Sequence, residues 1–275
     1  MDDLLLHPRT KLELTALLAD PPQALLFIAP AGAGKFTLAN AWAHQLGGGV
    51  TISTLEPDEK GTITIDATRS LYQRTRSKQA GRQVVIVDHA EAMSGEAQNA
   101  FLKLLEEPRQ NLTFILTATG LEDLLPTILS RVQVVMVQPI ASQNLASYAK
   151  NIAPDASDQA LQQLLFVANG RPATVVALLR DNAAFERAKL IMQRAKKLLS
   201  ASQYERLAMV QELAKDKIEL NTTLEAMAHM LKLQIMRGGS APQWLTLADT
   251  LQECLRRLRQ NGNPRAQLVH LFTTY

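Results

Sequence analysis

The chain has 275 residues, enough for two or three domains with one sizeable core, and its 47% apolar and 20% charged residues are ordinary for a globular protein. A formal charge of +3 is too small to indicate a nucleic-acid partner by itself, and the single cysteine, Cys254, excludes a disulfide framework and a cysteine-based zinc site. No apolar run reaches membrane-spanning length and residues 1–9 lack a signal-peptide pattern, so we expect a cytoplasmic protein without a membrane partner.

The first half of the chain alternates short apolar runs with amphipathic segments. Continuous apolar runs rich in β-branched residues are typical of parallel strands buried on both faces, and amphipathic segments between them are typical of crossover helices. This pattern predicts an α/β domain with a five-stranded parallel sheet. The expected strands are residues 25–28, 50–55, 84–87, 112–116 and 134–137, and the expected helices are residues 11–18, 35–46, 66–80, 94 to the break at Pro108, and 121–129.

A glycine-rich turn links the first strand to the next helix. Glycines allow backbone N–H groups to close on phosphates at a helix start, and a lysine there reaches the outer phosphates. Gly32, Gly34 and Lys35 fit this pattern, but an alanine replaces the first glycine and Phe36 replaces the magnesium-binding hydroxyl residue. Thr37 lies one position on, about 100° around the helix. The pattern indicates a phosphate-binding loop, with a tight turn that only packs helix on sheet as the alternative.

Polar side chains follow two of the other expected strands. Asp88 follows residues 84–87, and Thr117 and Thr119 follow residues 112–116. Ligands in open α/β sheets bind at the carboxyl ends of the strands. We therefore expect Asp88 to lie near the glycine-rich turn.

A run of basic residues without an acidic one begins within the third expected helix. Most charge runs are solvated helix faces, and this interpretation is kept for all members but the first. The run contains Arg69, Arg74, Arg76, Lys78 and Arg82.

Beyond Pro139 the strand pattern disappears and helical periodicity takes over. Helices are expected at residues 142–152, 157–168 and 172–179, followed by a helical block over 184–271 that turn-type sequences interrupt near 238–242 and 261–264. The predicted domains are an α/β nucleotide-binding-type domain (residues 1–138), a helical lid (139–182) and a helical collar for oligomerisation (183–275).

Taken together, several motifs resemble those of AAA+ ATPases of the clamp-loader family. The resemblance is dense over residues 25–180 and sparse but collinear afterwards, and NAFLKLLEEP followed by LSR at the family spacing is its most specific part. It implies an AAA+ P-loop domain, a small helical lid and an all-helical collar. The motifs are IAPAGAGKFTLA, ITIDATRSL, VVIVDHAEAMSGEAQNAFLKLLEEP, FILTATG, LLPTILSRV, ANGRPATVVALL and NGNPRAQLVHLF.

The resemblance implies a role for each matching residue. Lys35 and its loop correspond to the Walker A element, Asp88 to the Walker B acid and Thr119 to sensor 1. Ser130 and Arg131 match the family's Ser-Arg-Cys arginine-finger motif, with Val132 in place of the cysteine. We expect Arg131 at the far edge of the sheet from Lys35, where it would act on a neighbouring subunit's nucleotide.

The chain departs from the hydrolysing members of the family at three positions. Phe36 replaces the metal-binding hydroxyl, His89 replaces the water-orienting glutamate, and Ala173 stands where the sensor 2 arginine belongs. Phosphoryl transfer depends on positioned charge, so three losses at one site argue against turnover. The family's zinc module is also absent, so no zinc is expected, and bound ATP or ADP is left open.

The expected function is a non-hydrolysing structural subunit of a clamp loader within a DNA-directed DNA polymerase holoenzyme. Its expected partners are clamp-loader ATPase and delta-type subunits, the sliding clamp and primer-template DNA, with Arg69 matching a family arginine that meets DNA phosphate. Two alternatives are an ATP-hydrolysing motor subunit, with His89 and Thr37 as substitutes, and a stand-alone AAA+ regulator outside replication.

Overall fold

The computed structural model describes residues 4–47, 49–76, 81–106, 111–236, 242–259 and 262–274. The chain divides into two compact units, residues 1–155 with 170–176 and residues 156–169 with 177–275. The predicted three-part division stays a prediction. The expected helix stop at Pro108, the end of the basic helix at residues 77–80, and residues 238–241 and 261 of the two turn sequences lie outside the described residues.

The first unit is built on a five-stranded sheet in the order β2-β3-β4-β1-β5, and every neighbouring pair is parallel. The predicted five-stranded parallel sheet is therefore confirmed. Its strands are β1 (Ala24–Ile28), β2 (Thr51–Leu55), β3 (Gln83–Val87), β4 (Leu112–Ala118) and β5 (Gln133–Met136).

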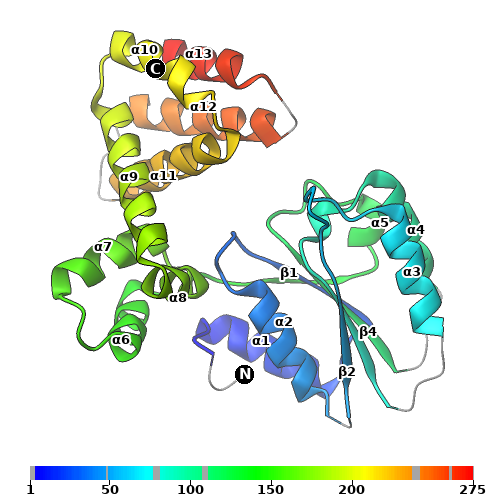
Figure 1. The fold of residues 1–275 in the computed structure, drawn as a ribbon. Coiled ribbons are helices and arrows are strands. Elements are labelled where there is room, and N and C mark those ends of the chain that lie inside the picture. The colour runs from blue at the N-terminus through cyan, green and yellow to red at the C-terminus, as the bar shows by residue number, and fades with distance from the viewer. Residues whose placement is uncertain are drawn as a thin grey trace. The chain divides into compact units, whose positions relative to one another are not determined.

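Helices cover both faces of this sheet (Figure 1). Alternate residues of β1 point to opposite faces: Leu25 and Phe27 pack with the first two helices, and Leu26 and Ile28 pack with the other three. The strands are thus buried on both sides, which explains their continuous apolar runs. The first pair is α1 (Pro8–Ala19) and α2 (Lys35–Gln45), and the opposite face carries α3 (Ile65–Arg76), α4 (Gly95–Glu106) and α5 (Pro126–Leu129).

The prediction of one helix over residues 121–129 is wrong in its first half. Only Pro126–Leu129 is helical, and Leu125 has extended dihedral angles of φ −61° and ψ 137°. A residue before proline is pushed out of the α region by a clash with the proline ring, whereas proline itself suits the first helical position. The helix therefore begins at Pro126.

The rest of the described chain is helical, as predicted. Five helices, α9 to α13, pack around the core of the second unit through the buried side chains of Leu198, Leu213, Leu224, Leu251 and Leu271. No helix among the described residues is long and apolar enough to cross a membrane. The helices are α6 (Ser142–Ile152), α7 (Asp158–Ala168), α8 (Pro172–Arg180), α9 (Asn182–Ser200), α10 (Gln203–Leu213), α11 (Lys217–Met236), α12 (Pro242–Arg259) and α13 (Pro264–Thr274).

Candidate functional site

The glycine-rich loop joins the carboxyl end of β1 to the start of α2. Gly32 and Gly34 both have left-handed backbone angles, with φ of 79° and 86°, a region that favours glycine. Lys35 opens α2, and its side chain turns back over the loop. Its Nζ donates to the carbonyl oxygen of Ala29 at 2.7 Å and lies 3.4 Å from that of Pro30. The lysine that the sequence pattern predicts to bind phosphates is thus hydrogen-bonded to backbone carbonyls of its own loop.

The electrostatic surroundings of Lys35 act in opposite directions. The side chain is buried, and burial lowers the pKa of its ammonium below the ordinary value because the charged form is desolvated. The carboxylates of Glu91 and, to a lesser extent, Asp88 raise this pKa and so favour the charged form. Two carboxylates therefore partly offset the effect of burial on the pKa of this lysine.

The two residues after Lys35 provide no inward hydroxyl. Phe36 packs against the apolar cluster between α1, α2 and the sheet. Thr37 is exposed and lies about 100° around α2 from Phe36. The position at which the family places a metal-binding hydroxyl is thus occupied by an aromatic ring that contributes to the core.

The start of α8 lies against the glycine-rich loop. The backbone N–H of Thr174 donates to the carbonyl of Gly32 at 3.1 Å, and Nη1 of Arg171 donates to the carbonyl of Ala31 at 3.3 Å. A Cβ atom added to Gly32 would lie 2.0 Å from Oγ1 of Thr174, and one added to Gly34 would lie 3.7 Å from the Cβ of Ala173. The segment matching sensor 2 therefore closes on the loop by direct contact.

Asp88 lies at the carboxyl end of β3, as predicted, and its partner is Thr117. The hydroxyl of Thr117 donates to Oδ1 of Asp88 at 2.5 Å and accepts the backbone N–H of His89 at 3.1 Å. Thr119, the predicted sensor 1 residue, contacts Glu91 through its backbone N–H, at 3.2 Å from Oε1. The hydroxyl that binds Asp88 is thus that of Thr117, and the role of Thr119 stays a prediction.

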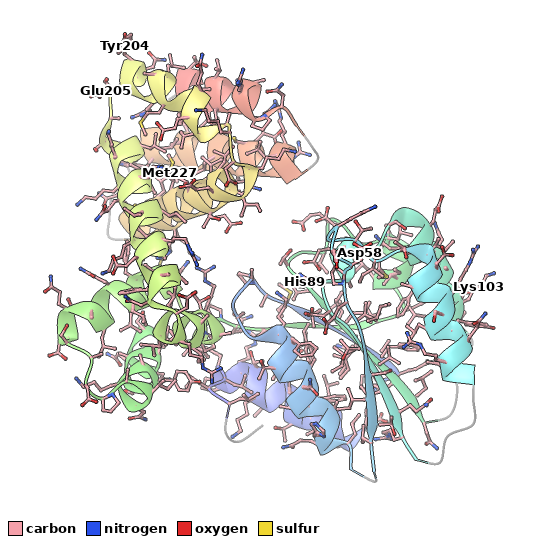
Figure 2. The ribbon with its side chains drawn as sticks, viewed as in Figure 1. Asp58, His89, Lys103, Tyr204, Glu205 and Met227 are labelled. Carbon is pink, nitrogen blue, oxygen red and sulfur yellow. The ribbon has the colours of Figure 1, made fainter. Side chains whose placement is uncertain are left out.

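Glu91 is a site residue that the sequence reasoning did not single out. Its Oε1 lies 3.3 Å from Nδ1 of His89, which has a left-handed backbone (φ 53°) and lies just beyond β3 (Figure 2). Oε2 of Glu91 is buried without a hydrogen-bond partner among the described residues. Glu91 comes three residues after Asp88, and that spacing on a turn following a strand is the one signal that could have found it.

The residues at this loop do not fit a bound magnesium–nucleotide. Lys35 donates to loop carbonyls, the metal-hydroxyl position is a phenyl ring, and Asp88 is already engaged by Thr117. The start of α8 contacts Gly32, whose neighbourhood a phosphate would need. In this arrangement, the loop at the carboxyl end of β1 packs directly against the start of α8.

The Ser130–Arg131 pair lies apart from this loop. It precedes the edge strand β5, which pairs with β1, so the expectation that it lies at the far edge of the sheet from Lys35 is wrong. The separation runs along the strands: the Lys35 loop follows the carboxyl end of β1, and Arg131 precedes the amino end of β5. The four paired residues alone span roughly 10 Å at ~3.3 Å per residue.

Arg131 and Ser130 are both exposed. Nη1 of Arg131 donates to the carbonyl of Thr127 at 3.0 Å and to Oγ of Ser130 at 3.2 Å. Its Nη2 lies 2.9 Å from Oε1 of Glu106, the last described residue of α4. The structure thus joins Ser130 to Arg131 by a hydrogen bond and adds Glu106 as an ion-pair partner of Arg131.

Arg69 lies in the first half of α3, on the face turned to solvent. Its Nη1 is 3.6 Å from Oδ1 of Asp66, and the two side chains are 66% and 86% exposed. Such an exposed pair contributes little to stability and leaves the guanidinium accessible.

Comparisons with known proteins match this chain to subunits of DNA polymerase III and of replication factor C. A family model described as DNA polymerase III, delta subunit, matches residues 50–141. The chain is 34% identical over 207 residues to the DNA polymerase III subunit delta-prime of Pseudomonas aeruginosa, covering 66% of this chain and 62% of that protein. It is 30% identical over 172 residues to replication factor C small subunit 2 of Pyrobaculum islandicum, covering 59% of this chain and 54% of that one.

Two solved structures share the fold. A DNA polymerase III gamma subunit-related protein from Thermotoga maritima matches with a TM-score of 0.51 and 18% identity, covering 96% of this chain and 97% of that one. The RuvB Holliday junction branch migration motor of Thermotoga maritima matches with a TM-score of 0.53 and 15% identity, covering 99% and 88%. The predicted AAA+ fold and the resemblance to the clamp-loader family are confirmed. The sequence alignments span less than two thirds of these curated relatives.

Proposed function

We propose that this chain, a relative of the DNA polymerase III delta-prime subunits, is a non-hydrolysing clamp-loader subunit that acts on a neighbour's nucleotide. The main support is the contrast between the glycine-rich loop and the Ser130–Arg131 pair. At the glycine-rich loop, Lys35 is bound to loop carbonyls and Thr174 closes on Gly32. At the other site, Ser130 and Arg131 keep the finger motif and remain exposed. One site is closed, and the other is available to a partner.

The chemistry of phosphoryl transfer explains why the first site would not turn over. It needs a lysine on the phosphates, a metal held by a hydroxyl and an acid, an oriented water and an arginine on the transition state. The chain has Phe36, His89 and Ala173 at three of these positions. The pairing of Asp88 with Thr117 adds a fourth obstacle, because the acid already accepts a hydrogen bond.

Arg131 is the residue we assign to the partner's ATP. Its planar, permanently charged guanidinium suits the oxygens of a γ-phosphate. From the amino end of β5 it does not reach its own glycine-rich loop, but it lies on the surface, where a second subunit can approach. An arginine finger supplied in trans is worth roughly 10³–10⁵ in turnover in GTPases, and a multi-site ATPase should lose less because its other sites keep their own fingers.

The experiment is Arg131→Ala in a clamp loader reconstituted with its motor and delta-type subunits, with assembly checked by size. We expect DNA-stimulated ATPase to fall while assembly stays intact. Arg187→Ala is the matched control, because Arg187 is an exposed arginine that pairs with Asp181 at 3.6 Å. Loss of assembly would make Arg131 structural, and full activity would remove it from the mechanism.

The proposed role includes primer-template DNA and the sliding clamp. Arg69 is exposed on α3, and we assign it to one DNA phosphate. One phosphate contact changes the slope of log affinity against log salt by only about 0.9, independent of DNA sequence. The test measures primer-template affinity of the assembled complex across a salt series for Arg69→Ala and for Arg74→Ala, which lies about 140° around the same helix. Identical slopes for both variants and wild type would reject the contact.

The alternative of a motor subunit predicts ATP hydrolysis by the isolated chain. We expect none, and we expect Phe36→Thr not to restore it because His89 remains. Turnover that Lys35→Ala abolishes would establish the motor instead. The alternative of a stand-alone AAA+ regulator predicts that the chain does not co-purify with a clamp-loader motor subunit, whereas our proposal requires that it does.

A further inference from the structure

The guanidinium of Arg131 is held by two different helices. Nη1 donates both to the Thr127 carbonyl on α5, at 3.0 Å, and to Oγ of Ser130, at 3.2 Å. Nη2 contacts Oε1 of Glu106, at the end of α4, at 2.9 Å. The side chains of Arg131 and Glu106 are 37% and 50% exposed, so this pair stands at the surface.

These contacts leave part of the fork available. Two Nη1 protons and one Nη2 proton are engaged, while Nε–H and the second Nη2–H of Arg131 have no acceptor among the described residues. Arginine binds carboxylates and phosphates best through two parallel N–H groups. Glu106 therefore fixes the direction of the guanidinium without consuming all of its donors.

Stability does not account for this arrangement. An exposed ion pair adds little to the stability of a fold, because solvent screens the attraction and both side chains lose rotamer freedom. Orienting Arg131 before a partner binds favours the binding step instead, because a side chain that is already ordered loses less conformational entropy on binding. The pair also ties the finger to α4, which lies beside α5 and starts a few residues after Asp88 (Figure 1).

We propose that Glu106 is a positioning residue for Arg131, orienting its guanidinium toward the nucleotide of the neighbouring subunit. The inference rests on the proposed trans-acting role of Arg131. Glu106 itself contacts no nucleotide in this arrangement. Its effect on the partner's turnover passes through Arg131 alone.

The test is a double-mutant cycle in the reconstituted complex, with Glu106→Ala, Arg131→Ala and both together. Glu106→Ala should lower kcat up to about thirtyfold at the affected site, the factor that the rotamer freedom of one arginine represents. The KM for ATP should not change, because the lysine and metal ligands of the partner are untouched. Glu106→Gln keeps an oxygen acceptor and should recover part of the loss.

The matched control is Glu96→Ala, an exposed glutamate in the first turn of α4 and about 15 Å from Glu106 along the helix. It should leave kcat at the wild-type value. Thermal unfolding of each isolated variant separates a folding defect from lost positioning, and Glu106→Gln is the variant to follow should Glu106→Ala fail to assemble.

The outcomes distinguish this inference from the proposed function. If Arg131→Ala leaves ATPase unchanged, the trans-acting finger itself is wrong. If Arg131→Ala lowers ATPase but Glu106→Ala and Glu106→Gln do not, only the positioning role falls. An increase in kcat for Glu106→Ala would show that Glu106 restrains the finger, and an equal loss in the Arg131→Ala background would show that it acts independently. The inference is supported only if Glu106→Ala has no further effect once Arg131 is alanine.

Discussion

Gly32→Ala measures how closely the start of α8 lies on the glycine-rich loop. At φ 79° a residue other than glycine costs about 1–2 kcal/mol, and the new Cβ would lie 2.0 Å from Oγ1 of Thr174. Relieving that clash means turning the Thr174 side chain out of its rotamer, at about 0.5–1.5 kcal/mol more. We expect Gly32→Ala to lower the free energy of unfolding by about 1.5–3.5 kcal/mol.

Two comparisons separate the backbone cost from the contact. Gly49 has φ 71° but open space around its Cβ position, so Gly49→Ala should show the backbone cost alone. In a Thr174→Ala background, the loss in free energy of unfolding caused by Gly32→Ala should fall to that of Gly49→Ala. Urea unfolding of a Trp244→Phe protein reports on the first unit, because the remaining tryptophan, Trp42, is fully buried there. If Gly32→Ala and Gly49→Ala lower the free energy of unfolding equally in the protein that keeps Thr174, the close contact between Thr174 and Gly32 is refuted.

Two further predictions concern buried polar groups. The side-chain amide of Gln98 donates to the carbonyl of Asp123 at 2.9 Å and accepts the N–H of Leu125 at 2.8 Å. Gln98→Met should therefore lower the free energy of unfolding, measured in urea, by about 2–4 kcal/mol, whereas Asn99→Met, at the exposed neighbouring position, should change it by no more than about 0.5 kcal/mol. Equal effects of the two substitutions would contradict this role of Gln98. Burial raises the pKa of Cys254 to about 11, and since the thiolate is the reactive form, native protein at pH 8 should resist iodoacetamide until it is unfolded. Rapid labelling of the native protein at pH 8 would contradict this.

The sheet was predictable because its strands are buried on both faces and therefore carry continuous apolar runs. The end of β4 shows the limit of that signal. The predicted strand stopped at Leu116 because Thr117 is polar, yet Thr117 is β-branched, pairs with Phe27 and is fully buried, with Asp88 as its partner. A buried hydroxyl looks like a loop residue until the group that accepts its hydrogen bond is known.

The motif positions were also predictable, but the direction of their side chains was not. The sequence places Lys35 at the start of a helix after a glycine turn, and the structure confirms that position. The contact of Thr174 with the loop joins residues that are distant in the chain, and the turn of the Lys35 side chain toward Ala29 depends on how the loop between them folds. Glu106 belongs to the most specific motif in the sequence, yet only the fold brings it to Arg131.

In the proposed role, this chain acts on a neighbour's nucleotide and not on its own. The most direct test compares DNA-stimulated ATPase of reconstituted complexes that carry Lys35→Met or Arg131→Ala, each checked for assembly. We predict wild-type ATPase for Lys35→Met and a loss of about tenfold or more at the affected site for Arg131→Ala. Loss of ATPase with Lys35→Met and full ATPase with Arg131→Ala would contradict the claim.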